Sequence, residues 1–184
     1  MDNENSLIVV ADEMSQYINM AVDFVDDLME DENFNIAVFN LTAEERKKLN
    51  NKSLYLDKKD NLTFEHIRKT CKRLKQKNNI NTVIIDLEDK DINEDHIELS
   101  KKLKELAEEL NLVIEIFTNI KKVTNRNFII IDNVEDKDIL EYADMIIISK
   151  YDYKNKKMLY VAKSDNDKYP VGYMNLEERG VENG

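Results

Sequence analysis

The sequence predicts an α/β protein whose mostly parallel central sheet lies between two layers of helices. Runs of β-favouring residues alternate with amphipathic helical segments along the chain, which is typical of strands joined by helical crossovers. One run, Thr82–Ile85, is continuous and ends at Asp86, as expected for a central strand buried on both faces. With 184 residues, of which 42% are hydrophobic, the chain is long enough for a full core. We expect one domain over residues 1–163, with the rest of a C-terminal hairpin and a tail over residues 164–184.

The first half of the chain is expected to form two strands and three helices. The first strand spans Leu7–Ala11, and a helix follows it over residues 18–28, where apolar side chains recur at helical spacing. The second strand spans Asn35–Leu41, and a capping-box pattern that starts at Thr42 begins a short helix. The third helix spans Thr63–Lys77 and has one apolar side.

The helix over Thr63–Lys77 is basic on its outer side. Cys71 lies on its apolar side and is expected to pack in the core. The outer side carries these cations: Arg68, Lys69, Lys72, Arg73, Lys75 and Lys77. We expect this side to be solvated or to contact the protein's own acidic surface, with nucleic acid or an acidic partner as the alternative.

The second half begins with the strand that ends at Asp86, from which an acidic loop leads to the longest helix, Glu94–Leu110. Its leucines repeat along one side and are expected to face the sheet, and Asn111 is suited to end the helix. Further elements are expected as follows: a strand at Leu112–Thr118, an apolar run at Phe128–Ile131, a short helix at Asp136–Tyr142, a strand at Met145–Ser149 and hairpin strands from Met158–Ala162 onward.

Composition narrows the classes of ligand and compartment. The net charge of −11 argues against free nucleic acid as a ligand of the whole domain, because polyanion binding depends on Lys and Arg. No apolar run approaches the roughly 20 residues of a membrane span, and the start M-D-N-E-N is unlike a signal peptide. A single cysteine cannot form an internal disulfide, so we expect a cytoplasmic protein. His66 and His96 have no second ligand at metal spacing and are expected on the surface.

Several strings, in one order, resemble the C-terminal motor domain of DnaB-type replicative helicases. They include S-L-Y-L-D with N-L-T-F-E-H-I-R-K-T-C-K-R-L-K, the strand that ends at Asp86, and S-K-K-L-K-E-L-A-E-E-L-N-L-V-I-E-I-F-T-N-I-K-K. The matches run from about residue 6 to residue 163. The resemblance implies a RecA-like P-loop-NTPase-type fold, with Asp86 at the end of the Walker B strand.

The phosphate loop implied by this resemblance is degenerate. Such a loop needs glycines to wrap the phosphates, a lysine to reach them and a hydroxyl residue for Mg²⁺. Residues 1–171 contain no glycine. The corresponding turn after the first strand has these residues: Asp12, Glu13, Tyr17, Ile18 and Asn19. Its two acids would also repel a triphosphate, so we expect no ATP or Mg²⁺ cofactor.

The other motor positions implied by the resemblance are also altered. Thr42 corresponds to the glutamate that orients water, Asn119 to a glutamine, and Lys163 with Asp165 to a lysine–arginine pair that acts across the subunit interface. Of this catalytic set, Asp86 alone is unchanged.

The family's two DNA-contacting loops differ in how well they are retained. The first corresponds to the acidic string E-D-K-D-I-N-E-D, which would repel a phosphate backbone. The second keeps Lys121, Lys122 and Arg126 as possible contacts to DNA or a partner.

Four hypotheses follow. The first is a non-catalytic helicase-like domain, an interaction or regulatory module for replication proteins or a helicase ring, with a homo-oligomer as a further possibility. The second is a weak nucleotide-binding ATPase. The third is a receiver-like Mg²⁺-dependent phosphoacceptor, because acids, an Asp, a hydroxyl and a lysine follow successive strands in this order: Asp12, Glu13, Asp86, Thr118 and Lys150. The fourth is a carboxylate metal site or merely a solvated loop at these residues: Asp86, Glu88, Asp89 and Asp91. We expect no catalytic residue and no metal.

Overall fold

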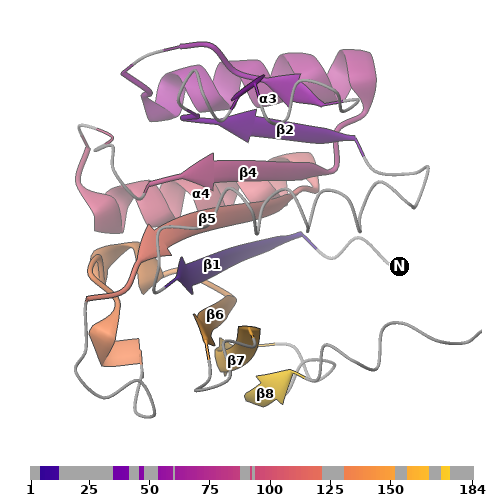
Figure 1. The fold of residues 1–184 in the computed structure, drawn as a ribbon. Coiled ribbons are helices and arrows are strands. Elements are labelled where there is room, and N and C mark those ends of the chain that lie inside the picture. The colour runs from indigo at the N-terminus through magenta and orange to yellow at the C-terminus, as the bar shows by residue number, and fades with distance from the viewer. Residues whose placement is uncertain are drawn as a thin grey trace, which may run out of the picture.

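A single mixed sheet organises the structure, a computed structural model that describes residues 5–12, 35–41, 46–47, 54–59, 61–87, 92, 94–121, 131–151, 157–165 and 171–174. Its eight strands lie in the order β3-β2-β4-β5-β1-β6-β7-β8 (Figure 1). Their bounds are β1 Ser6–Asp12, β2 Ile36–Phe39, β3 Tyr55–Leu56, β4 Thr82–Asp86, β5 Val113–Asn119, β6 Met145–Tyr151, β7 Lys157–Ser164 and β8 Gly172–Met174.

The sheet is parallel from β3 to β6 and antiparallel beyond. β1 pairs with β5 and β6, and β4 pairs with β2 and β5, all in parallel. β7 then pairs antiparallel with both β6 and β8. The predicted mostly parallel sheet with a C-terminal hairpin is therefore confirmed, and the parallel strands present their carboxyl ends at one edge.

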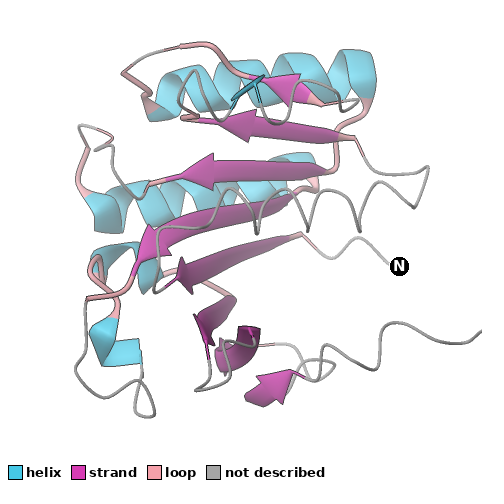
Figure 2. Cartoon of the chain, viewed as in Figure 1, coloured by secondary structure: helices cyan, strands magenta, loops and turns pink. Residues whose placement is uncertain are grey.

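Two long helices, α3 (Phe64–Asn78) and α4 (His96–Leu110), cover one face of the sheet (Figure 2). Leu99, Leu103 and Leu106 of α4 are fully buried in the same cluster as Cys71 of α3, so both predicted apolar sides pack as expected. α4 begins two residues later than predicted because the Asp95 side chain is its N-cap, accepting a hydrogen bond from the Glu98 N–H at 2.9 Å.

Asparagine takes the left-handed backbone positions that glycine usually occupies. Within the described part of the chain, the non-glycine residues with positive φ are Asn40, Asn61, Asn79 and Asn111, with φ between 49° and 67°. Asn79 and Asn111 end α3 and α4, as predicted for Asn111. Asn40 ends β2 earlier than predicted, because a left-handed residue cannot continue a strand.

Of the apolar run at 128–131, only Ile131 lies within the described residues. It begins the 3-10 turn η2 (Ile131–Asn133). Nearby backbone groups pair locally with the exit of β5, since Lys121 N donates to Asn133 O at 2.8 Å and Glu135 N donates to Asn119 O at 3.0 Å. The expected short helix at 136–142 is likewise one 3-10 turn, η3 (Asp138–Leu140).

No helix in the described ranges combines the length and the apolar character that crossing a membrane requires. The predicted helix over residues 18–28 lies outside the described residues.

Candidate functional site

Polar residues gather where β4, β5, β1 and β6 end. Asp86 is the last residue of β4, and Asn119 is the last residue of β5. The sheet register places Asp12 of β1 beside both Asn119 and Ser149 of β6. In open α/β sheets, ligands commonly bind at this edge.

Strand alternation decides which of these residues share a face. Ile84 and Phe117 belong to one core cluster, so Asp86 and Asn119, each two residues further along, point to that face. Thr118 is two residues beyond Ile116, which belongs to the opposite cluster. Asp86 and Thr118 therefore point to opposite faces, and β5 separates the Asp86 strand from β1. Among the described side chains, the two members Asp86 and Thr118 of the receiver-like constellation therefore do not share a face of the sheet.

Asp86 is buried, with 3% of its surface exposed, and its backbone is tied to the neighbouring strand. The side-chain amide of Asn40, just after β2, donates a 2.6 Å hydrogen bond to the Asp86 carbonyl. The sequence reasoning missed Asn40. The sequence feature that could have identified it is an asparagine directly after an apolar strand, since asparagine tolerates the left-handed conformation and its side chain carries a hydrogen-bond donor.

Replacement of Asn40 should separate these two roles. Asn40→Gly keeps the positive φ and loses the hydrogen bond, so we expect a loss of about 1 kcal/mol in the free energy of unfolding. Asn40→Ala loses both and should cost about 1 kcal/mol more. Urea denaturation of the two variants measures the difference, and equal losses would show that the backbone conformation contributes nothing.

A second missed residue, Glu115, lies in the middle of β5 between Ile8 of β1 and Ile84 of β4. It is 4% exposed, and burial raises the pKa of its carboxyl to about 8. Among the described residues, none provides it with an ion pair. Its signal in the sequence was a single acid that interrupts the apolar run V-I-E-I-F.

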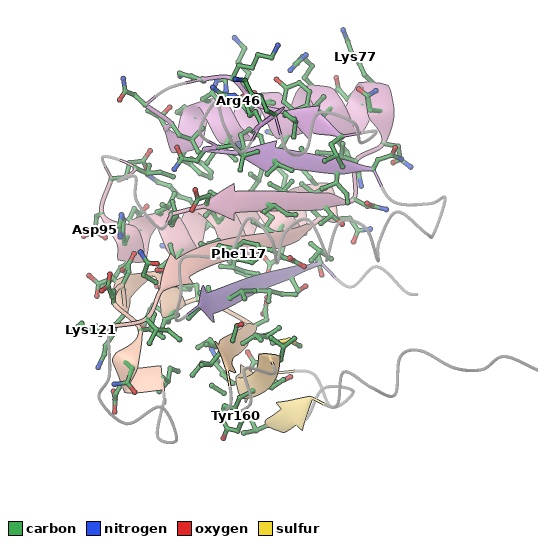
Figure 3. The ribbon with its side chains drawn as sticks, in the orientation of Figure 1. Arg46, Lys77, Asp95, Phe117, Lys121 and Tyr160 are labelled. Atoms are coloured by element: carbon green, nitrogen blue, oxygen red, sulfur yellow. The ribbon has the colours of Figure 1, made fainter. Side chains whose placement is uncertain are left out.

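The two basic positions that the structure describes differ in their surroundings. Lys163 of β7 donates through Nζ to the carbonyl of Ala143 at 2.5 Å, and its Nζ lies 4.0 Å from Asp165. Lys121 is exposed just beyond β5, on the side of the molecule opposite Lys77 (Figure 3).

Much of the predicted site lies outside the described residues: Glu13, Tyr17, Ile18, Asn19, Thr42, Glu88, Asp89, Asp91, Lys122 and Arg126. The side chains of Asp12 and Lys150 lie outside them too. Among the side chains that the structure does describe, no three His, Cys, Asp or Glu residues are grouped so as to hold a metal ion.

The histidines are less exposed than predicted, because each pairs with an acid. His66 Nε2 lies 3.0 Å from Asp57 Oδ1, and His96 Nδ1 lies 2.5 Å from Asp136 Oδ2. The His66 side chain is 24% exposed and that of Asp57 is 4% exposed. The contact between His66 and Asp57 links α3 to the residue that follows β3.

Comparisons with known proteins agree with this architecture. One solved structure, "The Structure Of A DnaB-Like Replicative Helicase And Its Interactions With Primase", aligns with a TM-score of 0.70 at 16% identity, covering 93% of this chain and 54% of that chain. This chain thus spans about half the length of that helicase chain and shares its RecA-like fold. A search of curated proteins finds no match. The family model for the DnaB-like helicase C-terminal domain matches residues 13–175. Because that match covers most of the sequence, the chain belongs to the family of DnaB-like helicase C-terminal domains.

Proposed function

We propose that this protein is a non-catalytic member of its family that serves DNA replication as a protein-interaction or regulatory module. The observation that carries the proposal is the absence of glycine from residues 1–171, a stretch that includes the whole turn after β1. A phosphate cradle needs backbone N–H groups that approach the phosphates closely, and glycine permits this approach. The turn also carries two acids, Asp12 and Glu13, which would repel a triphosphate, and Ile18 corresponds to the family's lysine.

The hairpin lysine supports the same proposal. The family's late basic pair acts across the subunit interface, whereas Lys163 is bonded to a carbonyl of its own domain. Asp165, in place of the arginine, carries the opposite charge. A lysine bonded within its own domain and followed by an acid is poorly suited to stabilise a neighbour's nucleotide, which supports our inference that neither ATP nor Mg²⁺ is a cofactor.

The partner that we propose is a protein of the replication machinery or a helicase ring. The related solved structure concerns a DnaB-like helicase and its interactions with primase, and this chain resembles about half of that helicase chain. A net charge of −11 disfavours nucleic acid as the principal ligand. Self-association and a cytoplasmic location are part of the same proposal.

Titration of the purified chain with ATP and Mg²⁺, following both binding and hydrolysis, tests this proposal. We expect no saturable binding up to millimolar nucleotide and no hydrolysis, and Asp86→Asn should behave identically. Micromolar binding that Asp86→Asn abolishes would establish the ATPase alternative instead. Labelling of Asp86 by acetyl phosphate would establish the phosphoacceptor hypothesis, although Thr118 points to the face of the sheet opposite Asp86.

A further inference from the structure

We draw no further inference here: the strongest candidate, the fully buried Ser149 hydroxyl at the carboxyl end of β6, which has no hydrogen-bond partner among the described residues, belongs to the sheet edge at which the candidate site lies, and the side chain of its β1 neighbour Asp12 lies outside the described residues, so nothing in the structure shows which group this hydroxyl would contact.

Discussion

Replacement of Glu115 by Gln is expected to remove a large pH dependence from the stability of this domain. The Glu115 carboxyl is buried, and its pKa in the folded state is about 8, compared with an ordinary value of 4.5. The folded state therefore binds a proton that the unfolded state releases between these two values. The free energy of unfolding of the unchanged protein should fall with rising pH over this window, by up to roughly 1.4 kcal/mol per pH unit.

The sign of this effect distinguishes Glu115 from the paired surface acids. Hydrogen bonds with Lys72 and Lys137, respectively, lower the pKa values of Glu109 and Asp132, so their contributions favour the folded state above their ordinary pKa values. Glu115 contributes in the opposite direction, favouring the folded state under acidic conditions. The difference between Glu115→Gln and the unchanged protein isolates its share, since the other acids are common to both.

Urea denaturation at pH 5.5, 7 and 8.5 measures this difference. We expect Glu115→Gln to gain stability relative to the unchanged protein as the pH rises, reaching several kcal/mol by pH 8.5. Glu105→Gln, on the exposed side of α4, should show no such gain and serves as the control. A constant difference across the three pH values would mean that the carboxyl titrates normally and is reached by water.

Local sequence signals predicted the elements whose causes are local. The strand Thr82–Asp86 has its predicted bounds, because a continuous run of β-favouring residues that ends in an acid can be recognised from the local sequence alone. Helix α3 matches within one residue at each end, since Thr63 caps one end and Asn79 adopts a left-handed conformation at the other. The resemblance to the helicase motor domain added the expectation of a RecA-like fold, which local patterns do not specify.

The sequence alone did not identify residues whose role depends on contacts with residues far away along the chain. Asn40 bonds to Asp86, 46 residues away, and only the pairing of β2 with β4 makes that contact possible. Glu115 is notable only because β1 and β4 enclose it on both sides.

Replacement of Asp144 by Ala is expected to give the largest loss of stability among single changes away from the core. Its carboxylate accepts hydrogen bonds from the Leu7 N–H at 2.7 Å and from Lys104 Nζ at 2.7 and 2.8 Å. It thus joins the start of β1 to α4 immediately before β6. Hydrogen bonds to a charged group contribute roughly 1.5–3 kcal/mol each, so we expect a loss of about 3 kcal/mol. For a chain of this size that loss lowers the melting temperature by roughly 6 to 12 °C.

A double-mutant cycle with Lys104→Met separates the two contacts of Asp144. Loss of the ion pair alone should make Lys104→Met the milder variant, because Leu7 N–H keeps its acceptor and the Asp144 side chain remains about a quarter exposed to water. Asp144→Asn should fall between the two, since its amide oxygen still accepts from Leu7 while the charge is gone. If Lys104→Met cost as much as Asp144→Ala, the ion pair would carry the whole effect. The hydrogen bond that fixes the entry of β1 would then contribute nothing to the stability of the sheet.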